Sequence, residues 1–238
     1  MKMIAFVVCF AAASGSGVSQ ANELAHGSGL KHAASDQVQR PAGSPPTRPP
    51  SASLVAPGVD CDDEAKCLAK LGGIATRSGK NLDLKLDNGS TKSFVSTDGC
   101  EIAGEACSIT SLVGYRPSQR WFVLSAQAYE SFASIIVSRR TGETFRIEDA
   151  SPRFSPDGKR FVVVAVSEQD GINELAIYNA RAFPPALEWR HTPKSISTMY
   201  DFVGWEGNDH IKLRKTNQNS KAKISWTSTG WKLSPAGR

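Results

Sequence analysis

The stretch Phe154-Ser155-Pro156-Asp157-Gly158-Lys159-Arg160-Phe161-Val162-Val163 decides the fold of this chain. An aromatic residue leads into a Ser-Pro-Asp-Gly turn, a basic residue closes the turn, and a second aromatic residue starts an apolar run. Proline, aspartate and glycine in this order are typical of a tight chain reversal. The stretch therefore predicts two antiparallel strands joined by a turn, the second of them buried.

The same pattern occurs twice more. An earlier copy is Tyr115-Arg116-Pro117-Ser118-Gln119-Arg120-Trp121-Phe122-Val123-Leu124, and its proline precedes Pro156 by 39 residues. A looser copy runs from Val203 to Leu213. Each copy is followed by two more strand-like segments, at 135–137 and 145–147, at 175–178 and 187–189, and at 224–226 and 231–233. A unit of about 40 residues with three or four antiparallel strands is typical of a propeller blade.

The stretch from Phe154 to Val164 resembles the central motif of the TolB-like (WD-type) β-propeller repeat, in which a strand enters a Ser-Pro-Asp-Gly-Lys turn and leaves as a buried strand. The resemblance is good over 152–189, fair over 112–147 and weak after 202. It implies the blade type and almost nothing about activity. The whole chain also resembles a group of uncharacterised exported bacterial proteins.

The number of units sets the expected architecture. Three units, or four if residues 74–100 count as one, are at or below the lower limit for a closed ring. We therefore expect an all-β fold, either an incomplete β-propeller or stacked antiparallel meanders, with one short N-terminal helix.

That helix and a hairpin are expected before the repeats. Asp60 is the expected N-cap, the acidic residues 62–64 suit the first turn, and Gly72-Gly73 ends the helix. Downstream, leucines alternate with polar residues at positions 82, 84 and 86, and Asn88-Gly89 is a strong hairpin signal. Strands with one buried face are predicted on both sides of this turn.

The N-terminus has the pattern of a secretory signal. One cation at Lys2 precedes an apolar run at 4–13, and small or polar residues follow up to Gln20. We expect cleavage after Ala21. The run is shorter than the roughly 20 residues that span a bilayer, so no membrane span is expected. The predicted organisation is a signal peptide at 1–21, a disordered Pro/Ser/Gly-rich tether at 22–59 and an all-β domain at 60–235.

Four cysteines remain after Cys9 leaves with the signal: Cys61, Cys67, Cys100 and Cys107. In an exported chain an even number of cysteines indicates disulfides first, and four allow three pairings. The two local pairings, 61 with 67 and 100 with 107, are favoured because each brackets a short polar segment. The alternative, a zinc site, does not fit the cysteine spacing, so no metal is expected. No cofactor is expected either, because the chain has no P-loop and no G-x-G-x-x-G after a strand.

Charge and aromatic residues are ambiguous. Loss of Lys2 takes the cations from 28 to 27 against 23 anions, a mature net charge of +4, which is ordinary for a soluble domain. A basic run extends from His210 to Lys223. It is interpreted as the outer face of two half-buried strands, with the lysines protecting a sheet edge, in preference to a nucleic-acid or acidic-glycan site. The tryptophans are expected in the core rather than in a sugar site; they are Trp121, Trp189, Trp205, Trp226 and Trp231.

No catalytic motif is recognisable. His26 and His32 lie in the tether, while His191 and His210 are not spaced to share a metal. Carboxylates that could form a glycosidase pair lie in expected turns; they are Glu143, Glu148, Asp149, Glu168 and Asp170. The expected function is a non-catalytic interaction module, periplasmic or secreted, that presents loops to a protein partner. The alternatives are a cell-wall or glycan hydrolase and an inhibitor of such an enzyme.

Overall fold

The computed structural model describes residues 58–97, 107–129, 131–167, 171–195, 198–216 and 220–235, all within the compact unit Pro50–Arg238. The expected signal peptide, and the tether up to residue 57, lie outside the described residues. The elements, in chain order, are β1 (Val59–Asp60), α1 (Glu64–Lys70), β2 (Ala75–Ser78), β3 (Asn81–Lys85), β4 (Thr91–Val95), β5 (Ile109–Arg116), β6 (Trp121–Gln127), β7 (Phe132–Ser138), β8 (Thr144–Glu148), β9 (Arg153–Phe154), β10 (Arg160–Ser167), β11 (Ile172–Asn179), β12 (Ala186–His191), β13 (Tyr200–Glu206), β14 (His210–Lys215), β15 (Ser220–Thr227) and β16 (Gly230–Pro235).

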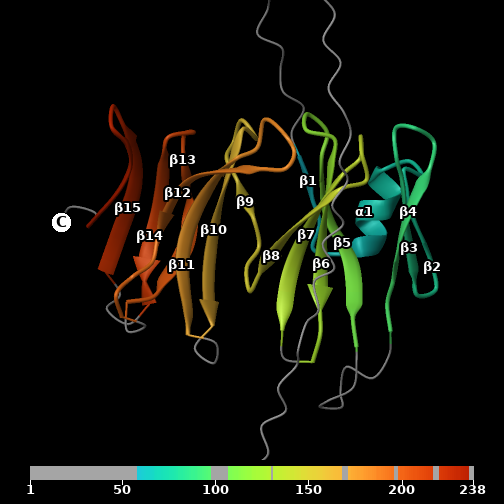
Figure 1. Ribbon diagram of the computed structural model, residues 1–238, viewed down its shortest axis with the longest axis horizontal. Helices are drawn as coiled ribbons and strands as arrows, with labels where there is room; N and C mark the ends of the chain where they lie inside the picture. Colours follow the sequence, from blue (N-terminus) through green and yellow to red (C-terminus); the bar gives the residue numbers. More distant parts are fainter. Residues whose placement is uncertain are drawn as a thin grey trace, which may run out of the picture. The chain divides into compact units, whose positions relative to one another are not determined.

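The strands form four antiparallel sheets that follow one another in chain order (Figure 1). The first sheet is β2-β3-β4, the second β1-β5-β6-β7-β8, the third β9-β10-β11-β12 and the fourth β13-β14-β15-β16. The all-β fold of stacked meanders with one short helix is thereby confirmed. Within the described residues no helix is long and apolar enough to cross a membrane.

Three apolar clusters join neighbouring sheets. The first lies between α1, the first sheet and the second, the next between the second and third sheets, and the last between the third and fourth. Successive residues of β10 pack in different apolar clusters, because Phe161 faces the second sheet and Val162 faces the fourth. A strand buried on both faces needs an uninterrupted apolar run, which explains the runs that begin at Trp121 and Phe161.

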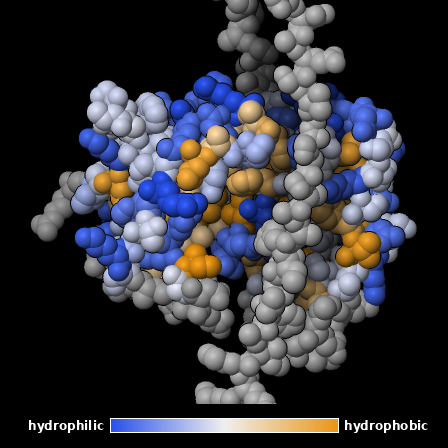
Figure 2. All heavy atoms as spheres, viewed as in Figure 1, coloured by the Kyte–Doolittle hydropathy of each residue, from blue (hydrophilic) through white to orange (hydrophobic). Residues whose placement is uncertain are grey.

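The outward faces of the first and fourth sheets carry many charged and polar residues, together with a few exposed apolar ones such as Val95 and Val203. In β14 the inward residues Ile211 and Leu213 are buried, whereas Lys212 and Arg214 are exposed. In β4 the outward positions are Thr91, Ser93 and the exposed Val95. Hydrophilic residues cover most of the described surface in Figure 2, and hydrophobic ones gather only in small patches. Such polar terminal faces are what an open series of stacked units requires.

The basic run therefore forms an outer face, as expected, but its location at a sheet edge was wrong. β14 pairs with both β13 and β15, and β15 pairs with both β14 and β16. Lys212 and Lys223 thus lie on interior strands and protect no edge. The edges of the fourth sheet are β13 and β16.

The expected helix cap was also wrong. Asp63 is the N-cap of α1, and its side chain accepts a hydrogen bond of 2.8 Å from the backbone N–H of Ala65. Asp60 instead belongs to β1 and pairs with Gly114 in β5. Both aspartates precede the helix, and the long-range pairing of β1 with β5 decides between them.

A disulfide joins Cys61 to Cys67, with the two Cα atoms 5.6 Å apart. This is the favoured local pairing, and it ties β1 to α1, where Cys67 is fully buried. Cys107 is disulfide-bonded as well. Its partner lies outside the described residues, as does Cys100, so that second pairing stays a prediction.

The tryptophans are not all core residues. Trp121 and Trp231 are buried, as expected, and Trp189 and Trp205 are half-buried. Trp226 is 44% exposed, so its expected place in the core was wrong. Its ring packs against Trp231 with the centroids 5.3 Å apart, and the guanidinium of Arg160 lies 5.2 Å from it.

Candidate functional site

The three repeated turns lie together along one edge of the sheets. The side-chain amide of Gln119 donates a hydrogen bond of 2.6 Å to the backbone oxygen of Gly158. The next turn along is joined in a similar way, because Asn208 accepts a hydrogen bond of 3.1 Å from the backbone N–H of Asp157. The second, third and fourth sheets are thus linked through equivalent positions of the repeat. We call the turns 117–120, 155–159 and 207–209 the turn edge.

The central turn of this edge is held by its own side chains. Asp157 accepts hydrogen bonds from the Ser155 hydroxyl at 2.8 Å and from the backbone N–H of Lys159 at 3.0 Å. Burial alone would raise the pKa of Asp157, but the hydrogen bonds from Lys159 and Ser155 together outweigh burial and lower it. The Asp157 carboxylate is thereby kept charged, and the loop is fixed in one shape.

Two further turns reach the same edge. Ser138 at the end of β7 lies opposite Trp121 at the start of β6, so the β7–β8 turn lies beside the 117–120 turn. Likewise, Asn179 at the end of β11 lies opposite Arg160 at the start of β10. The β11–β12 turn therefore joins the turn edge as well.

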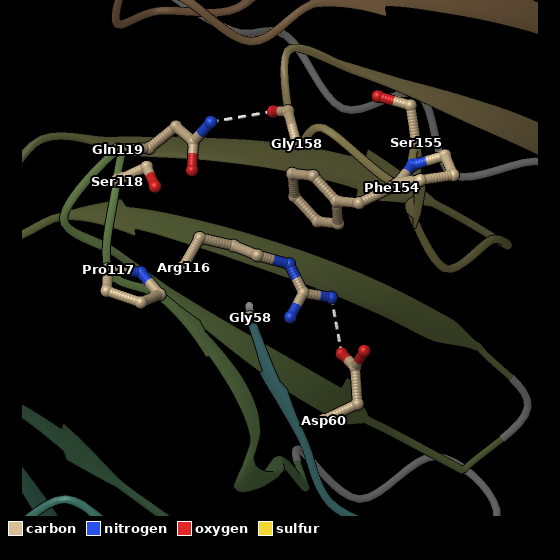
Figure 3. A pocket seen from close by; sticks show the side chains of 10 residues that line it. Gly58, Asp60, Arg116, Pro117, Ser118, Gln119, Phe154, Ser155 and Gly158 are labelled. Carbon is tan, nitrogen blue, oxygen red and sulfur yellow. Dashed lines mark hydrogen bonds and ion pairs between the residues drawn. The ribbon is translucent and has the colours of Figure 1, made fainter. Parts of the chain in front are cut away.

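A hollow of about 240 Å³ opens at the turn edge between the second and third sheets (Figure 3). We call it the Arg116 hollow. Its lining residues are Gly58, Asp60, Arg116, Pro117, Ser118, Gln119, Phe154, Ser155, Pro156 and Gly158.

The charge of Arg116 is already engaged. Its side chain is only 8% exposed, forms an ion pair with Asp60 and donates a hydrogen bond of 3.3 Å to the backbone oxygen of Val59. The guanidinium carbon lies 4.3 Å from the centre of the Phe154 ring, close enough for a cation–π contact. A side chain at Gly58 would overlap the guanidinium. Arg116 therefore fixes β1 against β5 and the third sheet, and its buried Nε atom has no hydrogen-bond partner among the described residues.

A second hollow, of about 190 Å³, shares Ser118 and Gln119 with the first. We call it the two-arginine hollow, because Arg140 and Arg181 both line it. The remaining lining residues are Trp121, Ser138, Ala180, Ala182 and Phe183. This lining contains no carboxylate, and both arginines are exposed. The two-arginine hollow thus has a positive potential that no lining residue offsets.

A third hollow, of about 380 Å³, lies along β10 away from the turn edge. We call it the β10 groove. β9 covers β10 only at Phe161 and Val162, so nothing in β9 pairs with Val164 or Val166, which line the groove. The other lining residues are Phe132, Asp149, Ala150, Ser151, Arg153, Tyr200, Asp201 and Phe202. β10 therefore has an uncovered edge beside a hollow lined by both charged and apolar residues, and an uncovered strand edge is a recognised place for an extended peptide.

Part of the positive charge on the basic outer face of the fourth sheet is paired with carboxylates. The Glu206 carboxylate forms ion pairs with the Nζ atom of Lys223 at 3.0 Å and with that of Lys212 at 3.2 Å. The hydrogen bonds from these two lysines lower the pKa of the Glu206 carboxyl. Arg214 pairs with Asp201 at 3.0 Å. A surface that binds a polyanion keeps its cations available. The pairing therefore favours a solvated outer face.

Among the described residues the candidate carboxylates do not form a glycosidase pair. Glu143 directly precedes β8 and Glu148 ends it, so they lie roughly 16 Å apart at strand spacing, which exceeds the separation that glycoside hydrolysis uses. Glu148 pairs with Arg146 at 2.6 Å, and Asp149 lines the β10 groove. Glu168 and Asp170 lie outside the described residues. A hydrolase based on these residues is not favoured.

The histidines are also separated. His191 stacks on Trp189, with the ring centres 5.9 Å apart. The Nδ1 atom of His210 is buried and has no hydrogen-bond partner among the described residues. His26 and His32 lie outside the described residues. In the part of the chain that the structure describes, no three metal-binding side chains come together.

The fold is that of an all-β protein of stacked meanders, compatible with a β-propeller-like architecture. No protein-family model matches the chain, and no curated protein does. Among solved structures it is similar to a protein described as a 6-phosphogluconolactonase from Bacteroides uniformis ATCC 8492, with 13% sequence identity and a TM-score of 0.38. The match covers 68% of this chain and 52% of that one, so it spans about half of that protein's length. A similarity of this size carries no argument about activity.

The residues that form the turn edge were only partly visible in the sequence. Gln119 and Asn208 lie in the turns of the first and third repeat copies. When the copies are aligned, these two residues fall at or next to the repeat position of Gly158. For Arg181, the repeat alignment gave no indication that it lies at the turn edge. It lies in a turn outside the repeated motif, and only the stacking of the third sheet on the second brings it to Arg140.

Proposed function

We propose that this protein is an exported, non-catalytic interaction module whose turn edge meets a protein partner in the cell envelope or outside the cell. The observation that carries this proposal is the pair of hydrogen bonds that link Gln119 to Gly158 and Asp157 to Asn208. Turns from three sheets are held in one arrangement before any partner arrives. A surface fixed in advance loses less entropy on binding than flexible loops do.

The exposure of this edge supports the same function. Ser118, Lys159 and Gly207 are exposed positions, one in each repeated turn. Loops positioned by a rigid scaffold are a common place for binding residues. The Cys61–Cys67 disulfide suits a protein that works in an oxidising compartment, as the predicted signal peptide requires.

Site-specific photo-cross-linking tests this proposal in the envelope of cells that export the protein. A photoreactive amino acid replaces Ser118 in the turn edge. The matched control replaces Tyr129, which is 43% exposed and lies in the β6–β7 turn at the opposite ends of the strands. We expect a discrete protein adduct from Ser118 and none from Tyr129.

Two results would contradict the proposal. One is the absence of a protein adduct from Ser118, Lys159 and Gly207 alike. The other is an adduct of equal yield from Tyr129, because the partner would then contact no particular edge. N-terminal sequencing of the exported protein checks the predicted cleavage, which leaves Asn22 as the first residue.

A further inference from the structure

The arginines that the structure describes divide into two groups. Most pair with a carboxylate; they are Arg77, Arg116, Arg120, Arg139, Arg146, Arg160, Arg190 and Arg214. Within the described ranges, Arg140, Arg153 and Arg181 have no carboxylate or hydrogen-bond acceptor for their side chains. Two of these three line the same 190 Å³ hollow. Two arginines that form no ion pair among the described residues thus line one hollow.

The inner part of this hollow holds another unused donor. Ser138 is 2% exposed, and its Oγ accepts a hydrogen bond of 3.3 Å from the backbone N–H of Thr141. The proton of this hydroxyl has no acceptor in the part of the chain that the structure describes. A hydroxyl can donate as well as accept, so Ser138 can offer its proton to an acceptor in the hollow that it lines.

Aromatic packing fixes the shape of the hollow. Trp121 is 3% exposed, and its ring meets Phe183 edge-on with the centroids 5.6 Å apart. Trp121 comes from the second sheet and Phe183 from the β11–β12 turn of the third. This contact holds Arg181 near Arg140, since each arginine lies in a turn next to one of these rings. The two turns that carry the arginines are thus held in place before a ligand binds.

We propose that the two-arginine hollow binds an oxyanion, the carboxylate or phosphate group of a small molecule, between Arg140 and Arg181. Guanidinium groups match both carboxylate and phosphate through paired hydrogen bonds, and the Ser138 hydroxyl supplies a further donor. The volume is below the roughly 300 Å³ at which pockets for whole drug-sized ligands begin. The hollow therefore takes one anionic group and little more. This site goes beyond the proposed interaction with a protein and does not depend on it.

Titrations followed by amide and indole NMR test the proposal on the exported protein. Inorganic phosphate is one probe and glucuronate is the other, each exchanged against chloride at constant ionic strength. We expect saturable shifts of the Trp121 indole and of the backbone amides of Arg140 and Arg181. Saturation with phosphate alone identifies a phosphate group as the ligand, saturation with glucuronate alone identifies a carboxylate, and saturation with both confirms the shared oxyanion chemistry.

Charge-removing variants separate this site from general surface attraction. Arg140→Gln and Arg181→Gln alter exposed side chains and should leave the spectrum of the fold intact. Each is expected to weaken binding about tenfold, which corresponds to roughly 1.4 kcal/mol. Arg146→Gln is the matched control, an exposed arginine on β8 that does not line the hollow. The proposal fails if neither probe saturates, if both variants bind as tightly as the wild type, or if the control loses as much affinity.

Discussion

The side-chain amide of Gln119 donates a hydrogen bond of 2.6 Å to the backbone oxygen of Gly158, 39 residues further along the chain. That separation equals the spacing of the repeat, so equivalent turns of two neighbouring sheets touch each other. We expect Gln119→Ala to lower the free energy of unfolding by about 1 kcal/mol, the usual contribution of one hydrogen bond. Urea unfolding measures the loss, and hydrogen exchange at Lys159 should show a looser turn.

The matched control for Gln119→Ala is Gln127→Ala. Gln127 is exposed at the far end of the same strand, β6, and its side chain has no hydrogen bond among the described residues. This variant should change the stability by less than about 0.5 kcal/mol. Equal losses in the two variants would mean that the contact between the turns contributes nothing.

Gly142 is in contact with a different sheet. It has φ of 76°, and an added Cβ would lie 2.8 Å from the Cδ1 atom of Leu86, in the turn between β3 and β4 of the first sheet. We expect Gly142→Ala to cost about 2 to 3 kcal/mol, because the positive φ and the overlap both oppose it. Gly79→Ala should cost only about 1 kcal/mol, since Gly79 has φ of 55° but nothing within 4 Å of its added Cβ. Thermal unfolding of both variants measures the difference, and equal costs would show that Leu86 moves aside freely.

The Cys61–Cys67 disulfide closes a short loop, with a sequence separation of 6. The chain-entropy relation gives about 2 kcal/mol for a loop of this size. We expect Cys61→Ser with Cys67→Ser to lower the unfolding free energy by about that amount, provided that the buried position of Cys67 tolerates serine. Cys67→Ala in place of serine separates the loss of the bridge from the burial of a hydroxyl. If both double variants were as stable as the wild type, the bridge would contribute nothing to stability.

The second disulfide can be tested by mass. The predicted signal cleavage leaves four cysteines, and two bridges among them predict a gain of four hydrogens on full reduction. Peptide mapping without reduction should then recover one peptide pair that contains Cys100 and Cys107. Free thiol at Cys100 in the exported protein would refute the predicted pairing.

Asp157 makes the stability depend on pH. Its folded-state pKa is lowered, so its contribution is fully present above the unfolded-state value of about 4 and is lost as the pH falls through the folded value. We expect Asp157→Asn to be less stable than the wild type at neutral pH, and the gap to close in acid. Urea unfolding between pH 7 and pH 2 measures the gap. A gap that stayed constant over this range would contradict the role assigned to the Asp157 carboxylate.

Local chemistry made much of the fold predictable. The Ser-Pro-Asp-Gly turn and the apolar run from Phe161 define β9, β10 and the connection between them, and Asn88-Gly89 does the same for β3 and β4. In each case the turn residues and the alternation of side chains are close together in sequence. Elements whose residues all lie within one such segment were predicted correctly.

Features that depend on how distant segments pack were not predictable. Asp60 was taken as a helix cap because the pairing of β1 with β5 joins segments more than 50 residues apart. Trp226 was placed in the core because its exposure depends on which face of β15 meets the third sheet. The convergence of Arg140 and Arg181 requires two sheets to stack in one particular way. A single sequence contains no local signal for that stacking.

The polar outer faces of the first and fourth sheets affect how a whole sheet could be gained or lost at either end of the stack during evolution. Each inner sheet packs against two neighbours, whereas the fourth sheet packs only through the cluster that contains Ile211 and Trp231. With nearest-neighbour packing, a terminal unit can detach, or a duplicated one can be added, without rearranging the rest. To add a sheet beyond the fourth, evolution would need to change only outward positions such as Lys212 and Arg214 to apolar residues.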